Sequence, residues 1–207
     1  TGGRGGIGTA IAAALGPDAE VTALDLPDFD VGDSDAWRAL EGEYDAAFLN
    51  AGIATGEYDV ASLSDEAYRR AVAANVDGVV FGVRECAARL MPRGGSIVAT
   101  ASLAGLTVSP FDPVYGLTKH AVVGFVRSVA PQLEAHGIRI NALCPGFTDT
   151  AIVLEELRGA LDVPLMDPSF VAEAALAALG DSETGRAWIV QPNRILPFRF
   201  PGIPGPR

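Results

Sequence analysis

The sequence begins with the glycine-rich stretch TGGRGGIG, residues 1–8, and continues into the Ala-rich segment 9–15. Glycines at the start of a helix let the backbone approach a pyrophosphate closely. The phosphates then meet free N–H groups and the positive end of the helix dipole. A glycine cluster can equally be an ordinary loop, so this stretch alone leaves a phosphate-binding turn and a plain turn open.

A carboxylate follows at the place where a dinucleotide ribose would lie. Asp25 is seventeen positions beyond Gly8, at the end of the next predicted strand, residues 19–26. A carboxylate there accepts hydrogen bonds from the ribose 2′-hydroxyl of NAD and repels the 2′-phosphate of NADP, so the pattern predicts an NAD site. A solvated acid at a strand end would look the same, and Arg4 keeps NADP binding open.

Short apolar runs alternate with longer helical patterns along the chain. This alternation predicts a Rossmann-type, doubly wound α/β fold with a parallel sheet, in a single domain over residues 1–207. The runs are rich in Val, Ile, Leu and Ala, as expected of central strands. The five predicted strands are residues 19–26, 46–50, 96–102, 138–144 and 187–191.

Two long helices have well-marked boundaries. The first is predicted over residues 65–91, with Ser64 placed to cap it and a proline and two glycines after it. The second is predicted to begin at Asp112, a capping side chain followed by a proline suited to the first helical turn, and to stop at Gly137. The proline-rich end, residues 197–207, is expected to be extended.

The sequence departs from the usual Rossmann pattern in two places. It opens at the glycine stretch, so the strand that should lead into that stretch is expected to be absent from it. Between Asp25 and Asp30 there is no room for a crossover helix, since parallel neighbours normally need a dozen or more connecting residues. A shortened connection and an omitted segment both remain open.

Composition narrows the class of protein. The 207 residues are 49% hydrophobic and 20% charged, which suits one globular domain with a substantial core. The net charge of -11 argues against a nucleic-acid partner. No run approaches the ~18 apolar residues of a membrane span, so we expect a cytoplasmic protein that does not bind membranes. Cys86 and Cys144 lie in apolar runs and are expected to be buried free thiols, not a disulfide or a metal site.

Tyr115 and Lys119 are four positions apart near the start of a predicted helix, so their side chains leave the same face. A free phenol has a pKa near 10, and a general base that works near neutrality needs that pKa lowered. A neighbouring ammonium and a nicotinamide cation can lower it. An ordinary surface Tyr beside a surface Lys is the alternative.

The types of basic residue in the sequence help to choose between a catalytic pair and an ordinary surface pair. Of the 15, 14 are Arg and only Lys119 is Lys, so the sequence uses Arg almost wherever a generic positive charge would serve. A compact ammonium can sit beside a phenol and bind a ribose, whereas a guanidinium is larger and does not exchange protons at neutral pH. The single lysine therefore points to a specific role.

Further polar residues follow predicted strands or interrupt a helix. Ser102 ends the strand 96–102, where its hydroxyl could hold a substrate oxygen or simply cap the next turn. Asn75 sits inside the helix 65–91, whose interior does not favour Asn, and it could hold a water or face outward. Asn50-Ala51-Gly52 ends another strand with small residues, which suits a close approach to a ligand or an ordinary turn.

Together these residues resemble the short-chain dehydrogenase/reductase family over nearly the whole chain. The match lies in several short motifs that occur in the family's order and close to its spacings. They are Thr1-Gly2-x-x-x-Gly6-Ile7-Gly8, Asp30-Val31, Asn50-Ala51-Gly52, Asn75, Ser102, Tyr115-x-x-x-Lys119, and Pro145-Gly146 followed by Thr150.

The resemblance implies roles for these residues. Tyr115 would be the acid/base and Ser102 would orient and polarise the carbonyl. Lys119 would bind the ribose and lower the pKa of the phenol, and Asn75 would maintain a proton relay. The residues expected to bind the cofactor are Gly2, Arg4, Gly6, Ile7, Asp25, Asp30, Val31, Asn50, Ala51, Gly52, Tyr115, Lys119, Pro145, Gly146, Thr148 and Thr150, with Thr148 standing where the family usually has Val or Ile.

Within the family, residues 102–106, 113–120 and 141–147 are most similar to the hydroxyprostaglandin dehydrogenases. Asp112 differs, because that branch carries a substrate-contacting glutamine at this place. This difference argues against a prostaglandin-like substrate.

The expected activity is hydride transfer between NAD and a secondary alcohol or ketone. A hydrophobic substrate is expected because the family covers it with the segment 151–170, although core or subunit packing explains the same apolar residues: Ile152, Val153, Leu154, Leu157, Leu161, Leu165, Met166 and Phe170. An NAD-binding regulator without turnover and an NAD-retaining dehydratase or epimerase are the alternatives. The resemblance also implies a homodimer or homotetramer built on the helices 65–91 and 113–136.

Overall fold

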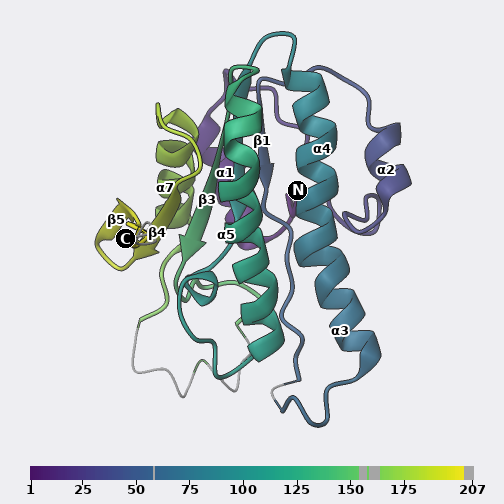
Figure 1. The fold of residues 1–207 in the computed structure, drawn as a ribbon, viewed down its shortest axis with the longest axis vertical. Helices are drawn as coiled ribbons and strands as arrows, with labels where there is room; N and C mark the ends of the chain where they lie inside the picture. Colours follow the sequence, from purple (N-terminus) through teal and green to yellow (C-terminus); the bar gives the residue numbers. More distant parts are fainter. Residues whose placement is uncertain (58, 154–157, 159–163, 203–207) are drawn as a thin grey trace, which may run out of the picture.

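The computed structural model describes residues 1–57, 59–153, 158 and 164–202. Figure 1 shows a central sheet with helices on both faces. In chain order the helices and strands are α1 (Gly6–Leu15), α2 (Ser34–Ala39), β1 (Ala46–Leu49), α3 (Asp65–Val72), a π-helical turn (Ala73–Asp77), α4 (Gly78–Leu90), β2 (Gly95–Thr100), a 3-10 turn (Leu103–Gly105), α5 (Pro113–Glu134), β3 (Ile138–Pro145), α7 (Pro168–Gly180), β4 (Ala187–Gln191) and β5 (Arg194–Pro197).

The sheet has the order β1-β2-β3-β4-β5, with the first four strands parallel and β5 antiparallel to β4. Alternate residues of the strands face opposite layers, as the pleat requires. Ile97 and Ile140 pack in the core that includes α4 and α5, whereas Val98 and Leu143 pack in the core that includes α1 and α7. The predicted doubly wound α/β fold is therefore confirmed.

Four predicted strands correspond to β1, β2, β3 and β4. The prediction 187–191 matches β4 at both ends, and the ends of 46–50, 96–102 and 138–144 differ by at most two residues. The fifth prediction, a strand over residues 19–26, is wrong. That segment is extended, but a cavity of about 690 Å³ separates it from β1. Its backbone contact with the glycine stretch is one hydrogen bond, from Gly3 N–H to the Leu24 carbonyl at 3.2 Å, so no ladder forms.

The predicted helix boundaries are largely right. Helical backbone runs from Asp65 to Leu90, and the Ser64 hydroxyl caps it by accepting from the backbone N–H of Ala67 at 3.2 Å. The helix α5 begins at Pro113 behind the Asp112 cap, and it ends at Glu134, three residues before the predicted end.

The connection from Asp25 to Asp30 contains no helix in the structure. Backbone N–H groups of Asp28 and Phe29 both donate to the Asp25 carbonyl, which forms a turn where a crossover helix would otherwise lie. Cys86 and Cys144 are buried free thiols. Among the described residues, no helix is both long and apolar enough to span a bilayer.

Candidate active site

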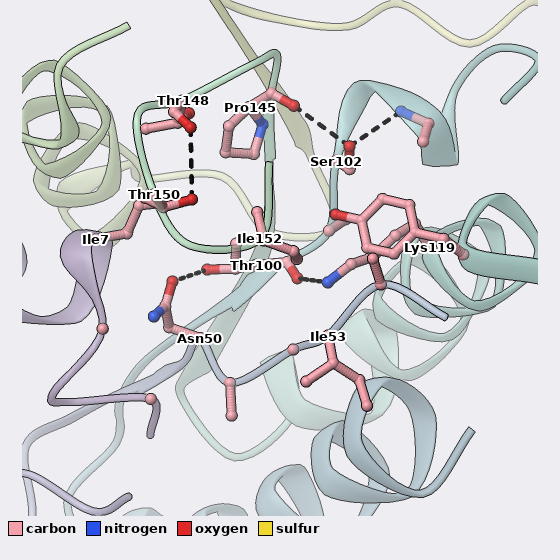
Figure 2. A pocket seen from close by; sticks show the side chains of 18 of the residues that line it. Ile7, Asn50, Ile53, Thr100, Ser102, Lys119, Pro145, Thr148, Thr150 and Ile152 are labelled. Atoms are coloured by element: carbon pink, nitrogen blue, oxygen red, sulfur yellow. Dashed lines mark hydrogen bonds between the residues drawn. The ribbon is translucent and has the colours of Figure 1, made fainter. Parts of the chain in front are cut away.

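A cavity of about 610 Å³ lies where the carboxyl ends of β1, β2 and β3 meet the start of α1. Ligands bind at this edge in open α/β sheets. The residues that the sequence predicts to bind the cofactor or act in catalysis line the cavity, except Arg4, which lies beside it, and Asn75, which lies just behind its wall. Figure 2 shows Ile7, Asn50, Thr150 and Ser102 arranged around the same space.

The glycine stretch packs against the end of β1. Gly2 has φ +62°, and a Cβ there would lie 3.0 Å from the backbone of Ala51, so only glycine fits without strain. The Thr1 hydroxyl accepts from the backbone N–H groups of Asn50 and Ala51, both at 3.1 Å. Two motifs that are 50 residues apart in sequence thus form one wall of the cavity.

Asp25 and Arg4 lie together at one end of the cavity. The Asp25 carboxylate accepts from the backbone N–H of Arg4 at 2.8 Å and from that of Leu26 at 2.9 Å. The Arg4 guanidinium turns to the other side, where it pairs with Asp28 and donates to the Leu26 carbonyl at 3.0 Å. The nearby Asp30 and Val31 line the cavity.

Lys119 is buried and Tyr115 is partly buried where it lines the cavity, so the alternative of an ordinary surface pair is wrong. The Lys119 amine is 5.4 Å from the centre of the Tyr115 ring, and it donates to the Thr100 carbonyl at 2.9 Å (Figure 2). Lys119 is only 2% exposed. Burial lowers its pKa to about 8, so the amine is mainly charged at neutral pH.

The phenol of Tyr115 is largely buried beside Ser102. Burial raises the pKa of Tyr115 to about 12, and its hydrogen bond with Ser102 acts in the opposite direction. The Ser102 hydroxyl also lies 3.4 Å from the Pro145 carbonyl and accepts from the backbone N–H of Ala104 at 3.1 Å. In the protein by itself the effect of burial is the larger one, so the pKa of the phenol lies above its ordinary value near 10.

Asn75 points inward from the π-helical turn and is fully buried, so the outward-facing alternative is wrong. Its carbonyl oxygen accepts from the backbone N–H of Ile53 at 2.8 Å, and its amide donates to the Ile53 carbonyl and the Thr118 hydroxyl, both at 2.9 Å. A Cβ at Gly52 would lie 3.1 Å from the Lys119 amine and 3.2 Å from the Asn75 carbonyl oxygen. Gly52 thus leaves room for both groups.

The segment after β3 also lines the cavity, through residues that include Gly146, Thr148 and Thr150. Thr148 is buried, and its hydroxyl donates to the Gly146 carbonyl at 3.1 Å. The Thr150 hydroxyl donates to the Thr148 carbonyl at 3.4 Å (Figure 2). A threonine at position 148 is therefore accommodated by a bond to its own loop.

The structure describes only part of the segment 151–170, which is expected to cover the substrate. Ile152 and Val153 line the cavity, whereas Met166 and Phe170 pack into the core beside α7. Ile152 and Val153 thus fit the prediction of a substrate cover, and Met166 and Phe170 fit the alternative of core packing. Leu154, Leu157 and Leu161 lie outside the described residues.

Thr55 and Asp112 connect two parts of the site through a bond that no sequence motif predicts. Thr55 and Asp112 are buried, and they bond to each other across the cavity wall. The N-cap pattern reveals Asp112 as a cap but not its second partner. Thr55 carries no local signal, because its position in a loop has neither a motif nor a periodicity.

The fold and the placement of these residues define the class of Rossmann-type proteins. The family model described as Enoyl-(Acyl carrier protein) reductase matches residues 9–184. The chain belongs to this family, the short-chain dehydrogenase/reductases.

Individual relatives agree with this assignment. "Short-chain dehydrogenase reductase ATA1" from Arabidopsis thaliana is 33% identical over 73% of this chain and 56% of its own length. "3beta-hydroxysteroid dehydrogenase" from Mediterraneibacter gnavus is 36% identical over 59% of this chain and 47% of its own length. The chain spans about half the length of the curated relatives it matches.

The fold also matches solved structures. A 3-oxoacyl-[acyl-carrier protein] reductase from Brucella melitensis has a TM-score of 0.80 and 28% identity, over 92% of this chain and 87% of that one. A structure described as "ElxO with NADP Bound" has a TM-score of 0.77 at 22% identity, over 91% of this chain and 94% of that one, a likeness of fold.

Proposed function

We propose that this protein transfers a hydride between NAD and a secondary alcohol or ketone. The observation that carries the proposal is the meeting of Tyr115, Lys119 and Ser102 in one cavity with the glycine stretch. Relatives named as 3beta-hydroxysteroid dehydrogenase and as A-factor type gamma-butyrolactone 1′-reductase support it, since both names describe alcohol or ketone chemistry.

The residues present fit a dinucleotide. Glycine at position 2 keeps the backbone turn close to Ala51, and the N-terminus of the ten-residue helix α1 follows it. Asp25 offers a carboxylate to the cavity, and Thr148 and Thr150 on the loop after β3 also line it. When bound, the oxidised nicotinamide supplies the hydride acceptor and a positive charge.

In the oxidative direction, the Tyr115 phenolate takes the hydroxyl proton of the alcohol while Ser102 holds the oxygen. In the reductive direction, the Tyr115 phenol gives a proton to the carbonyl oxygen. Lys119 provides the fixed positive charge within 5.4 Å of the ring centre, which favours the phenolate. Asn75 holds the backbone beside that charge and maintains the path for the proton.

Asp25 favours NAD over NADP in this proposal. Its carboxylate would accept from the ribose 2′-hydroxyl and repel a 2′-phosphate. Arg4, the cation that could bind such a phosphate, is already paired with Asp28. A solved relative at 28% identity is described as a 3-oxoacyl-[acyl-carrier protein] reductase with bound NAD, which is consistent with this preference.

The substrate class is proposed to be hydrophobic. Val108 and Phe111 line the cavity although they are 83% and 52% exposed, and Phe147 lines it at 37%. An apolar body would cover these side chains while its oxygen reaches Ser102. This supports a bulky alcohol more than a prostaglandin-like acid, since Asp112 would repel a carboxylate.

We also propose a cytoplasmic homodimer or homotetramer. Two buried free thiols suit a reducing compartment. Tyr68 on α3 and Leu117 on α5 are exposed apolar side chains on the helices expected to pair, and light scattering of the purified protein would test the pairing.

The test of the activity is Tyr115→Phe. Reduction of NAD would be followed by absorbance with three probes: a 3β-hydroxysteroid, borneol and 2-octanol. We expect a loss of at least about 100-fold in kcat, with binding of NADH unchanged by fluorescence. Turnover at the wild-type rate in this variant would refute the assignment, and turnover without net reduction of NAD would favour a dehydratase or epimerase.

A further inference from the structure

The carboxylate of Asp112 is bonded from two separate segments around the cavity. One oxygen accepts from the backbone N–H of Tyr115 at 2.8 Å. The other accepts from the backbone N–H and the hydroxyl of Thr55, both at 2.8 Å. Asp112 is 6% exposed and Thr55 is 4% exposed, so water does not compete strongly for these bonds.

The two segments carry groups of the proposed reaction. The first turn of α5 carries Tyr115. The loop after β1 carries Ile53, whose backbone binds both polar ends of the Asn75 amide. Asp112 therefore joins two segments: the loop after β1, whose Ile53 backbone binds Asn75, and the first turn of α5, which carries Tyr115.

We propose that Asp112 is a positioning residue of the active site, which holds the first turn of α5 in register with the loop at Ile53–Thr55. The inference rests on the proposed function, because it takes Tyr115 as the acid/base. A helix cap alone needs one bond, to Tyr115 N–H. The two bonds to Thr55 exceed what capping requires.

The same carboxylate lies in the electrostatic surroundings of the phenol. Among the described residues, four groups face Tyr115: the Ser102 hydroxyl just after β2, the Cys144 thiol of β3, the Lys119 amine of α5 and the Asp112 carboxylate. Burial raises the pKa of Cys144 to about 12, so this thiol is neutral. The Asp112 carboxylate acts on the phenol in the same direction as burial, since it raises the pKa of Tyr115.

The first experiment needs no substrate. Asp112→Asn keeps an oxygen that can cap Tyr115 N–H but turns an N–H donor toward Thr55. We expect hydrogen exchange of the Thr55 backbone amide to accelerate by about tenfold or more, while the first turn of α5 stays protected. The matched control is Asp33→Asn, which changes an exposed carboxylate that caps α2 through Asp35 N–H and does not line the cavity.

The second experiment measures the pH profile of kcat for oxidation with NAD and the best of the three alcohol probes. In Asp112→Asn we expect the midpoint to move to lower pH, because removal of the anion eases deprotonation of Tyr115. Thr55→Val keeps the Asp112 side chain itself, so kcat should fall with the midpoint unchanged, and Thr55→Ser should retain kcat. Asp33→Asn should leave both quantities as in the wild type.

Three outcomes would overturn the proposal. Unchanged exchange at Thr55 in Asp112→Asn would reduce Asp112 to a helix cap, and so would an unshifted midpoint. Should Asp112→Asn fail to fold, equal kcat in Thr55→Val and the wild type would be decisive against it. If the wild type oxidises none of the three alcohols, the proposed function fails, and hydrogen exchange still decides whether Asp112 holds the loop.

Discussion

A residue that suits the proposed reaction can lower the stability of the fold, and Lys119 is the clearest case. Its charged amine is buried with one hydrogen-bond partner, the Thr100 carbonyl. Burial penalises the charged form, which is why the pKa of Lys119 falls to about 8. The folded state therefore holds a charge at neutral pH that the unfolded state would leave in water.

We predict that Lys119→Met stabilises the fold while it abolishes oxidation. At pH 7 the free energy of unfolding should rise by about 1–3 kcal/mol, because a buried charge is replaced by an apolar chain of similar length. Between the folded pKa near 8 and the higher unfolded value, the unfolded wild type binds more protons, so wild-type stability increases with pH. The gain should therefore shrink between pH 7 and 10, as measured by urea denaturation. A variant less stable than the wild type at pH 7 would contradict this account.

A second residue-scale prediction concerns the choice of cofactor. Asp25→Ala removes the carboxylate that would repel a 2′-phosphate, so the ratio of kcat/KM for NAD to that for NADP should fall by about 10- to 100-fold. Asp28→Asn should lower the ratio by itself, because it frees Arg4 for the phosphate. Initial rates with each cofactor measure both effects. An unchanged ratio in both variants would show that specificity lies elsewhere.

Among the elements, the helix over residues 65–91 shows what a sequence can and cannot predict. Its start at Ser64 depends on a local cap and was predictable. The π-helical turn Ala73–Asp77 was not, because the inward direction of Asn75 depends on bonds to Ile53, which is 22 residues away. Thr55 could not be recognised for the same reason, since its partner Asp112 is 57 residues distant.

The prediction for this element is that Asn75→Ala destabilises the protein by about 2 kcal/mol, because the N–H and the carbonyl of Ile53 both lose their partner. Thr118→Val is the matched control, since it removes only one of the three bonds to the Asn75 amide. It should cost less than half as much in urea denaturation. Equal losses in the two variants would mean that the bonds to Ile53 are not what the helix depends on.

For the whole molecule, the apolar pattern predicted the four parallel strands of the sheet. Residues 46–50, 96–102, 138–144 and 187–191 all join the sheet. Residues 19–26 have the same local pattern, but pairing is a property of two segments, and the cavity beside β1 leaves this one without a partner in the described chain. The strand β5 was missed, although the Pro192-Asn193 turn before it, with φ 60° at Asn193, is a recognisable hairpin signal.

Trp37 connects the core to Val31, a residue that lines the cavity. Its indole N–H donates to the Val31 carbonyl at 2.8 Å, and its ring packs edge-on against Phe29 at 5.0 Å. Trp37→Phe should therefore raise the KM for NAD severalfold and leave kcat unchanged, since Val31 loses its fixed position. Trp188→Phe, in strand β4, removes a bond to Asp181 and should leave the KM unchanged. Equal KM values in both variants would rule out this connection.

Because Tyr115 and Lys119 stand one turn apart on α5, a small tilt of this 22-residue rod carries the phenol and the ammonium along together. The distance between the phenol and the ammonium therefore changes little when the domain fluctuates. Ser102 comes from the end of a strand and does not share that motion, so the gap between hydroxyl and phenol is the dimension that thermal movement alters. Substrate alignment, rather than the electrostatics of the pair, is where such motion would be felt.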